Sequence, residues 1–386
     1  MTRTVPPEPP LRVAHIIHSL GPGGAESVLV ELADVASSAG LELLVIALSP
    51  TPRPVHAASL RARGVPVVEL DLARWDPRAV SRTLAVLRRH RIQVVHTHLK
   101  HADLVGAVAG RILGLPVVST LHVVEDSPTG RLGLLKRSLG LVARRRVAAR
   151  TVAVSTAQRA WYLGLSGTER GLVVLPNGVA DPGLPDPETR RRIRAELDVP
   201  DGRPLVISAA LMRPEKGHDL LLDAVAMLAA DAAPVVALAG DGPLRAQLEA
   251  RVAADPALSG RVRFLGYRED VPTLLGAADL VLHTSLADAL PTTLMQALAV
   301  GVPVVATDVG GIPDIVTPDT GVLTAPRAAD LAAAMTDLLR DAPTRERMGT
   351  AGRLRYLDRF EAVGWAARLR CLYGTVCAPE PAAARR

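Results

Sequence analysis

The sequence has few aromatic side chains and few cysteines. Phe, Trp and Tyr together make up 2% of its 386 residues, which leaves little surface for stacking nucleic-acid bases. The two cysteines, Cys371 and Cys377, have neither CxxC spacing nor a nearby histidine, so we expect no disulfide framework and no cysteine metal site. These absences predict a reduced, cytoplasmic protein that does not bind nucleic acid.

Several motifs are also missing. No run of 18 apolar residues occurs, and the first ten residues are proline-rich, so neither a membrane-spanning helix nor a signal peptide is expected. The sequence contains no Asp-x-Asp pair and no Gly-Lys-Ser/Thr of a Walker loop. We therefore expect no metal site and no cofactor.

Apolar residues, in contrast, make up 48% of the sequence, and the net charge is +6. The positive charge comes almost entirely from arginine. It fits either attraction to anionic partners or a compositional preference for Arg over Lys, and we favour the second reading. A chain of 386 residues exceeds one ordinary core, so we expect two domains.

Short apolar runs alternate with helical stretches along most of the chain. This alternation predicts an α/β fold with parallel sheets covered by helices. From residue 323 to about 373 the Ala-rich sequence predicts helix alone. The predicted strands are 11–17, 43–48, 65–70, 93–95, 117–119, 151–154, 172–175, 205–209, 235–239, 262–265, 280–282 and 303–306.

The most informative stretch covers residues 281–309. A buried strand is followed by a loop, then by Pro291 at the start of a helix, then by another strand. Ligands of α/β sheets bind at the carboxyl ends of strands, and the N–H groups that begin a helix favour an anion. The residues alone leave open a plain strand–helix–strand unit without a ligand.

This stretch resembles the nucleotide-binding signature of the retaining glycosyltransferases of group 1, also called glycosyltransferase family 4. That signature has two glutamates separated by seven residues. Pro291 and Ala297 fill its proline and alanine positions, whereas Asp288 and Gln296 stand where the family has glutamate. The resemblance extends over about residues 11–373 and implies two Rossmann-like domains facing a cleft, the GT-B arrangement.

The segment R-P-E-K-G, which begins at Arg213, is similar to the R-x-x-K-G of the same family. The resemblance implies that Arg213 and Lys216 stabilise the departing diphosphate. It also implies that Asp288 contacts the sugar hydroxyls and that Gln296 contacts the ribose. Gln296 has one acceptor oxygen where a glutamate has two. The remaining residues that we expect to bind the donor in this part of the chain are Gly240, Pro291, Thr292 and Thr293.

Gly23 and Gly24 lie between strand 11–17 and the helix that follows. Their spacing does not match the dinucleotide fingerprint, and alone they fit either a phosphate-binding loop or a tight turn for packing the helix on the sheet. The G-G-A-E that they begin is similar to a segment of family-4 members, which implies that both glycines bind the donor.

Three histidines lie near predicted strand ends. His96 and His98 are two residues apart, but no acidic or third ligand is spaced to complete a metal site, so we expect them to be structural. His122 follows strand 117–119 and alone fits a turn histidine. The resemblance implies that it lies beside the transferred sugar and the acceptor, where an imidazole exchanges hydrogen bonds with a hydroxyl.

Residues 130–150 combine leucines with basic side chains. This composition predicts either a surface helix with a solvated basic face, which we favour, or a helix that lies on an anionic membrane. The residues concerned are Leu132, Leu134, Leu135, Lys136, Arg137, Leu139, Arg144, Arg145 and Arg146.

The domain boundaries follow from proline-rich breaks and from the resemblance. We expect disordered tails at both ends, an acceptor-binding domain, a linker, a nucleotide-sugar-binding domain, and a last helix that returns to the first domain. In chain order the boundaries are 1–10, 11–180, 181–203, 204–360, 361–377 and 378–386.

The resemblance implies a reaction in which a hexose moves from a UDP- or GDP-sugar to a hydroxyl with retention of anomeric configuration. The acceptor would be a cell-surface glycan, a lipid-linked molecule or a small secondary metabolite, and the protein would be cytoplasmic or peripheral at the inner membrane face. One alternative is a non-catalytic nucleotide-sugar-binding homologue that acts as partner of an active enzyme, motivated by Asp288 and Gln296. Another is a sugar-nucleotide epimerase of the same fold. The G-G-A-E that begins at Gly23 and the R-P-E-K-G that begins at Arg213 argue against it.

Overall fold

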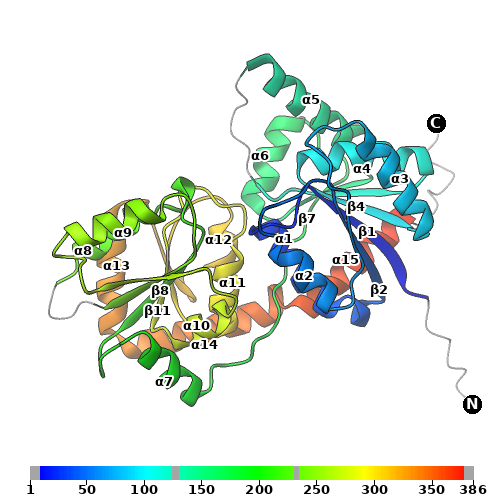
Figure 1. Ribbon diagram of the computed structural model, residues 1–386. Coiled ribbons are helices and arrows are strands. Elements are labelled where there is room, and N and C mark those ends of the chain that lie inside the picture. The colour runs from blue at the N-terminus through cyan, green and yellow to red at the C-terminus, as the bar shows by residue number, and fades with distance from the viewer. Residues whose placement is uncertain (1–8, 124–129, 230–233, 378–386) are drawn as a thin grey trace, which may run out of the picture. The chain divides into compact units, whose positions relative to one another are not determined.

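The computed structural model describes residues 9–123, 130–229 and 234–377. The chain forms two compact units. Unit 1 comprises Met1–Ala180 with Ala362–Arg386, and unit 2 comprises Asp181–Glu361. Each unit is an α/β domain built on one parallel sheet (Figure 1). The two predicted tails fall largely on residues outside the described ranges.

The sheet of unit 1 has seven strands in the order β3-β2-β1-β4-β5-β6-β7. The strand order reverses between β1 and β4, which is where open α/β sheets place their ligands. The strands are β1 (Leu11–Ile17), β2 (Leu41–Ala47), β3 (Val67–Glu69), β4 (Val94–His98), β5 (Val117–Thr120), β6 (Arg150–Ala153) and β7 (Leu172–Val174).

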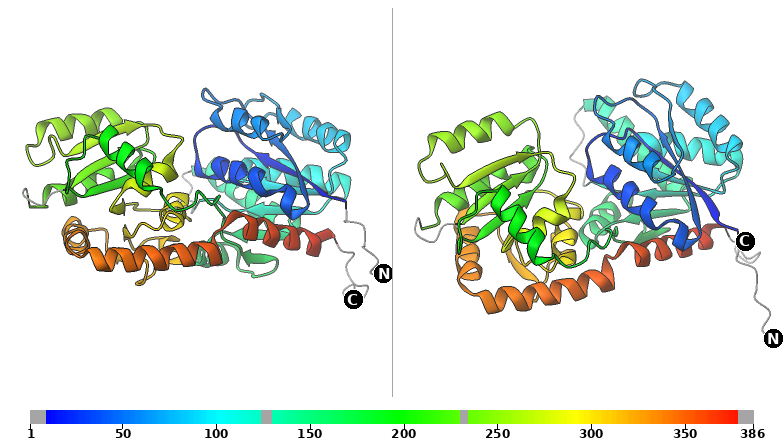
Figure 2. Two further views of the ribbon diagram at one scale, coloured as in Figure 1. Left: turned by 90° about the horizontal axis from the view of Figure 1, so that it is seen from below. Right: turned by 60° about the horizontal axis from the view of Figure 1, so that its bottom comes forward.

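Helices cover both faces of this sheet because successive side chains of a strand point to opposite sides. Val13 and Ile17 pack with α1, α2 and α15, whereas Ala14 and Ile16 pack with α3 and α4. The last helix, α15, packs against α1 and η1 (Figure 2). The helices of unit 1 are α1 (Gly24–Val35), η1 (Ser37–Ala39), α2 (Val55–Ala62), α3 (Arg78–Arg89), α4 (Lys100–Leu113), α5 (Gly130–Arg146), α6 (Thr156–Ser166) and α15 (Ala362–Cys377).

The sheet of unit 2 has six strands in the order β10-β9-β8-β11-β12-β13, so its order reverses between β8 and β11. Its central strands are fully buried, which explains their continuous apolar sequences. The strands are β8 (Leu205–Ala209), β9 (Val235–Ala239), β10 (Val262–Gly266), β11 (Leu280–His283), β12 (Val304–Thr307) and β13 (Gly321–Thr324).

Helices α8, α9 and α13 lie on one side of this sheet, and α10, α11 and α14 lie on the other (Figure 1). The helices of unit 2 are α7 (Pro187–Glu196), η2 (Pro214–Lys216), α8 (His218–Ala226), α9 (Arg245–Ala254), α10 (Val271–Ala277), α11 (Thr292–Ala299), α12 (Ile312–Ile315), α13 (Ala328–Arg340) and α14 (Ala342–Arg359).

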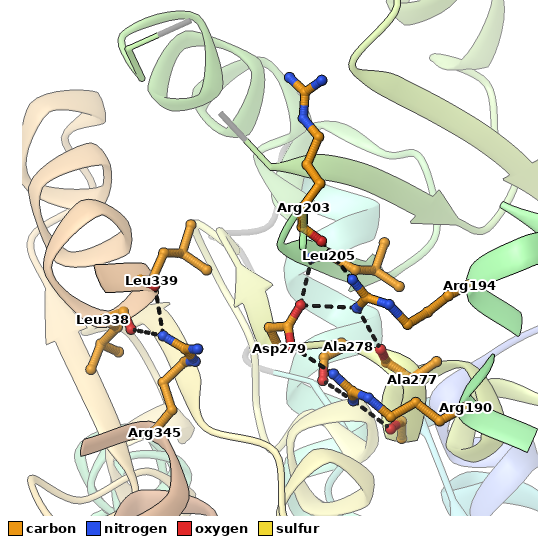
Figure 3. A network of polar contacts seen from close by, with 11 residues as sticks. Arg190, Arg194, Arg203, Leu205, Ala277, Ala278, Asp279, Leu338, Leu339 and Arg345 are labelled. Carbon is orange, nitrogen blue, oxygen red and sulfur yellow. Dashed lines mark hydrogen bonds and ion pairs between the residues drawn. The ribbon is translucent and has the colours of Figure 1, made fainter. Parts of the chain in front are cut away.

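The prediction of a linker at 181–203 was wrong, because this segment belongs to unit 2 and contains α7. Asp186 caps α7 by accepting from the backbone N–H groups of its first turn. Arg190 and Arg194 of α7 both bind the carboxylate of Asp279, at 2.6 and 3.0 Å, and Asp279 also accepts from the backbone of Leu205 (Figure 3). These contacts fix α7 to the start of β8 and to the turn before β11.

The sequence predicted helix alone from residue 323 to about 373, and most of this segment is helical. The last strand ends at Thr324, and three separate helices follow it. The third of them, α15, begins at the hydrogen bond from Ala362 N to the carbonyl of Val179, so the chain re-enters unit 1 beside the point where it left. No helix within the described ranges is long and apolar enough to span a membrane.

Candidate active site

The most heavily contacted functional side chain of unit 2 is the carboxylate of Asp288. Lys216 Nζ lies 2.5 Å from its Oδ2, Ser285 Oγ donates to the same oxygen at 3.1 Å, and His283 Nε2 lies 3.2 Å from it. Within the described part of the chain, Asp288 Oδ1 has no such partner. One oxygen is therefore held by the protein, and the other is available to accept a hydrogen bond from a ligand.

These contacts determine the charge of Asp288. Burial acts to raise the pKa of the carboxyl group, but the hydrogen bond from His283 and the positive charge of Lys216 outweigh it. The pKa of Asp288 is therefore held well below its usual value, so the carboxylate is ionised at neutral pH.

Backbone contacts bring the two loops together where the strand order of unit 2 reverses. Lys216 ends η2 after β8, and Asp288 lies in the loop after β11. The backbone N–H of Leu286 donates to the carbonyl of Glu215 at 2.8 Å, and Thr284 Oγ1 donates to the carbonyl of Gly217 at 3.0 Å. The sequence predicted Lys216 and Asp288 as separate site residues, and the structure joins them in one ion pair.

Two glycines allow other loops to approach closely. Gly310 has a φ of +55°, and a Cβ on it would lie 2.0 Å from the carbonyl oxygen of Asp288. A Cβ on Gly240, whose φ is +142°, would lie 2.0 Å from the carbonyl oxygen of Ala210. Both positions need glycine for the backbone conformation and for the space. Gly240 thus lets its loop approach the backbone of Ala210, in the loop before Arg213. Gly310 lets its loop approach the backbone of Asp288.

The other predicted donor-binding residues of unit 2 lie around α11 and the loop after β8. Pro291 is the N-cap of α11, and Thr293 Oγ1 donates to the carbonyl of Ala209 at the end of β8, at 2.9 Å. Thr292 begins the helix, and Gln296 lies one turn later with a half-buried side chain. Arg213 is exposed and forms no ion pair with any residue that the structure describes.

In unit 1, Gly23 and Gly24 lie at the beginning of α1, as the N-cap and first residue. Gly23 has an extended φ of −178° that any residue can adopt, and a Cβ on Gly24 would meet nothing within 4 Å. A Cβ on Gly23 would lie 2.2 Å from Glu26 Oε2, so the tight turn that the sequence left open remains an alternative at this position.

His122 lies two residues beyond the end of β5, and its side chain is half-buried. Its Nε2 lies 2.8 Å from His98 Nδ1. Burial lowers the pKa of His122 to about 4, with a smaller contribution from the positive charge of Arg144, so the ring is neutral at pH 7. It can exchange hydrogen bonds with a neutral hydroxyl without carrying charge.

The expectation that no third ligand accompanies His96 and His98 was wrong. Both lie inside β4, and His15 of the neighbouring strand β1 joins them. All three are buried, and one ring nitrogen of each lies within 4.8 Å of the others. Sequence spacing could not reveal this group, because His15 comes from a strand about 80 residues earlier that the sheet brings alongside.

One of the basic side chains of helix α5 is buried, although the sequence predicted a solvated basic face. Arg144 is buried and forms an ion pair with Asp103 at 2.6 Å, so it anchors α5 to α4 and is not available to an outside partner. Arg145 and Arg146 are exposed. Leu134, Leu135, Leu139 and Val142 are exposed too. The side chains of Leu132 and Lys136 lie outside the described set.

Sequence reasoning missed the side chains that hold the predicted ones. His283 and Ser285 contact the carboxylate of Asp288. His98 contacts His122, and His15 contacts His98. The available signal was position, since His283 ends a buried strand and His15 lies on the same strand face as the core residues Val13 and Ile17.

Two family models match the chain and together cover most of it. The model described as Glycosyltransferase Family 4 matches residues 22–181, and the model described as Glycosyl transferases group 1 matches residues 189–355. The first match lies in unit 1, apart from its last residue, and the second lies in unit 2.

Characterised relatives are similar over most of their length. The 2-deoxystreptamine glucosyltransferase of Streptomyces kanamyceticus is 30% identical, with 83% of this chain and 85% of the relative covered. The 2-deoxystreptamine N-acetyl-D-glucosaminyltransferase of Streptomyces fradiae is 31% identical, with 81% and 77% covered.

Solved structures share the fold. Anabaena HepE, determined in complex with UDP-glucose, superposes with a TM-score of 0.82 at 23% identity, over 95% of this chain and 99% of that one. The sucrose-phosphate synthase of Thermosynechococcus elongatus gives a TM-score of 0.79 at 21% identity, over 95% and 98%. With both family models matched and relatives at 30% identity over most of the chain, the protein belongs to the group 1, family 4 glycosyltransferases of GT-B fold.

Proposed function

We propose that the protein transfers a hexose from a UDP- or GDP-sugar to an acceptor hydroxyl, with retention of anomeric configuration. The observation that carries this proposal is the arrangement around Asp288. Its Oδ2 is held by Lys216, Ser285 and His283, which leaves Oδ1 for a donor hydroxyl of the sugar. A carboxylate that is ionised at neutral pH makes strong, charge-assisted hydrogen bonds of this kind.

Lys216 and Arg213 supply the positive charge for the leaving group. As the bond between the anomeric carbon and the diphosphate oxygen breaks, negative charge grows on the diphosphate, and fixed cations stabilise it. Lys216 Nζ has three donors, and the contact with Asp288 occupies one of them. The N–H groups of Thr292 and Thr293 at the beginning of α11 favour a phosphate at the same strand ends.

The remaining roles follow the chemistry of the side chains. Gln296 accepts one ribose hydroxyl and donates to another oxygen, and Gly23 and Gly24 contact the donor through their backbone. His122 exchanges a hydrogen bond with the transferred sugar or the acceptor as a neutral imidazole. The side chains of the protein replace a metal ion at the diphosphate.

Relatives named as 2-deoxystreptamine glycosyltransferases support a small polyhydroxylated acceptor over a polymeric glycan. The test is a panel of UDP- and GDP-sugars with aminocyclitol and lipid-linked acceptors, read by mass spectrometry, with the anomeric configuration read by NMR. We expect one hexosyl unit on the acceptor with the configuration of the donor. Nucleotide binding without transfer or hydrolysis of any donor would favour the non-catalytic homologue instead.

Variants of Asp288 and His122 separate binding from chemistry. Asp288→Asn should reduce transfer far more than nucleotide affinity, because its charge acts at the sugar. His122→Ala should reduce transfer more than donor binding, for the same reason. Equal losses of nucleotide affinity and rate would place either residue at the nucleotide instead.

A second property concerns the exposed side of α5. We propose that this helix contacts an anionic lipid surface, supported by four exposed apolar side chains near the exposed Arg145 and Arg146. The apolar side chains are Leu134, Leu135, Leu139 and Val142. The wild type should sediment with anionic vesicles, whereas a Leu134→Ser, Leu139→Ser variant should stay in the supernatant. Equal sedimentation of both proteins would contradict lipid contact.

A further inference from the structure

Unit 1 contains a group of histidines on one face of its sheet. Strand alternation places His15, His96 and His98 on the side covered by α1 and α15, and each is at most 2% exposed. The register pairs His15 with His96 directly and places His98 two residues further along β4. The carboxyl ends of β1 and β4 are where the strand order of this unit reverses.

Two hydrogen bonds link His15, His98 and His122 in a row. His15 Nδ1 lies 2.9 Å from His98 Nε2, and His98 Nδ1 lies 2.8 Å from His122 Nε2. These three residues form a chain of imidazoles, which we call the histidine relay. His96 is outside it, because its Nδ1 contacts the hydroxyl of Tyr373 and its Nε2 contacts Thr120 Oγ1, both at 2.6 Å.

The geometry favours a hydrogen-bond network over a metal site. Histidines around a zinc ion point one nitrogen each at a common centre, about 2 Å away. Here the rings of His96 and His98 stack, with centroids 4.6 Å apart and planes 22° apart. Both nitrogens of His96 are occupied, and the facing nitrogens of His15 and His98 contact each other directly.

Such a relay has only two consistent arrangements of protons. A neutral imidazole carries one N–H and one bare nitrogen, so every bond in the chain must run in the same direction. Burial lowers the pKa of His15 to about 3 and that of His98 well below its usual value, so both rings are neutral at pH 7. The direction of the chain then determines which nitrogen of His122 carries hydrogen.

The buried end of the relay selects the direction. His15 Nε2 is buried and has no hydrogen-bond partner. If the bonds ran inward from His122, this atom would be a buried N–H without an acceptor, and for backbone groups unpaired buried donors are rarer than unpaired acceptors. If they run outward, it is a bare nitrogen, and His15 donates to His98, which donates to His122.

We propose that His15 and His98 are positioning residues that hold His122 as its Nδ1–H tautomer. Nδ1, the ring nitrogen that does not contact His98, is then a hydrogen-bond donor. Among the described residues, Nδ1 of His122 has no partner. A donor at this position binds an oxygen lone pair of a sugar or acceptor, and it does not remove a proton from the attacking hydroxyl. The identity of the ligand rests on the proposed transfer function, whereas the tautomer does not.

The test is NMR spectroscopy of the full-length protein with ¹⁵N-labelled histidine at pH 7.5, without donor. Correlations between ring nitrogens and ring protons distinguish the two tautomers of each histidine, and single-residue variants assign them. We expect His15, His98 and His122 all as Nδ1–H. A wild-type spectrum with His122 as Nε2–H would overturn the proposal without any variant having to fold.

Two variants test the dependence. In His98→Phe, the Nδ1–H fraction of His122 should fall, and transfer should fall about five- to tenfold, the size of one lost hydrogen bond. The matched control is Tyr373→Phe, which removes a contact of His96 in the same group and should leave the tautomer of His122 unchanged. An unchanged tautomer in His98→Phe would contradict the positioning role.

Two further measurements separate the explanations. Calorimetric titration of metal-free protein with Zn²⁺ should show no stoichiometric binding. Tight binding that is lost in His15→Phe would replace the relay with a metal site. If the tautomers are as expected but His122→Ala transfers sugar at the wild-type rate, the proposed role of His122 fails and the relay stands.

Discussion

The first six strands of unit 1 and the six strands of unit 2 follow the same order, but the two units place opposite chemistry where that order reverses. In unit 1, β1 and β4 contribute histidines that burial keeps neutral. In unit 2, the loops after β8 and β11 contribute Lys216 and Asp288, which form an ion pair. The fold therefore supplies the position of a site, and the residues after the strands supply its chemistry.

This difference fits the roles that we propose for the two sets of side chains. A departing diphosphate carries growing negative charge, which needs fixed cations. A sugar or acceptor hydroxyl is neutral, and a neutral donor with a defined tautomer binds it without the cost of burying charge. The five predictions below test the contrast, from the largest expected effect to the smallest.

Loss of the cations of unit 2 should have the largest effect. We expect Lys216→Ala and Arg213→Ala each to lower turnover by roughly 10²–10³, the loss expected for one transition-state donor. Arg347→Ala, an exposed arginine on α14, is the control and should keep wild-type turnover. Steady-state kinetics with the best donor of the panel measures the effect. Wild-type turnover in both site variants would contradict the assignment.

The same variants should differ in stability. Lys216→Ala leaves Asp288 half-buried with His283 and Ser285 but without its cation, so the unfolding midpoint should fall. Arg213 is exposed, so Arg213→Ala should leave the midpoint unchanged. Equal midpoints for both variants would mean that the Lys216–Asp288 pair adds nothing to folding.

Acid should destabilise unit 1 before unit 2. The folded-state pKa values of His15 and His122, about 3 and about 4, lie below the unfolded value of 6.5, so the folded state binds fewer protons. Their contribution is complete above pH 6.5 and is lost as the pH falls toward 4, at about 1.4 kcal/mol per pKa unit. In unit 2 the lowered pKa of Asp288 acts only below about pH 4, although His218 also titrates low.

Tryptophan fluorescence can follow this loss, because Trp75, Trp161 and Trp365 all lie in unit 1. Between pH 7 and 4.5 the urea midpoint by fluorescence should fall further than the midpoint by circular dichroism, which reports both units. His15→Phe should flatten the fluorescence dependence, and His218→Phe in unit 2 should not. Midpoints that fall in parallel would show that the units do not differ in this way.

Gln296 should affect nucleotide binding moderately. We expect Gln296→Ala to weaken UDP or GDP affinity by about 1–2 kcal/mol, the range for losing one hydrogen-bond partner. Gln296→Glu should bind equally or more tightly, because a carboxylate accepts two hydroxyls. Gln247→Ala, an exposed glutamine on α9, is the control. Calorimetric affinities of Gln296→Ala that equal the wild type would remove position 296 from the ribose.

The smallest effect should come from chelation. In the proposed mechanism Lys216 and Arg213 take the place of a metal at the diphosphate, so transfer should be unchanged in excess EDTA. Activity that disappears in EDTA and returns with magnesium or manganese would place the diphosphate elsewhere. Activity that returns only with zinc would instead indicate a metal site at His15, His96 and His98 of unit 1.

The sequence predicted most strands because buried parallel strands are short apolar runs. It missed β13, in which Gly321 begins a strand whose other side chains are half-buried, so the apolar signal is weak. It also missed α7, whose charged sequence resembles a linker, although Arg190 and Arg194 are held by Asp279. Here an interaction between distant residues overrides the local pattern.

Among site residues, the sequence and the resemblance identified side chains one at a time. The contact between Lys216 and Asp288 joins loops about 70 residues apart, and the histidine relay joins β1, β4 and the residue after β5. Such pairings depend on sheet order and register, which no local motif encodes. The role of Gly310 was equally hidden, because it is defined by the carbonyl of Asp288 that it approaches.

The return of the chain to unit 1 has a consequence for synthesis. Trp365, Leu369 and Tyr373 of α15 belong to the core on the α1 face, and the Tyr373 hydroxyl contacts His96. A ribosome releases these residues only after all of unit 2 has been made. Unit 2 can therefore fold while unit 1 still exposes an apolar face, and a chain that stops at residue 361 should aggregate through that face even though unit 2 is complete.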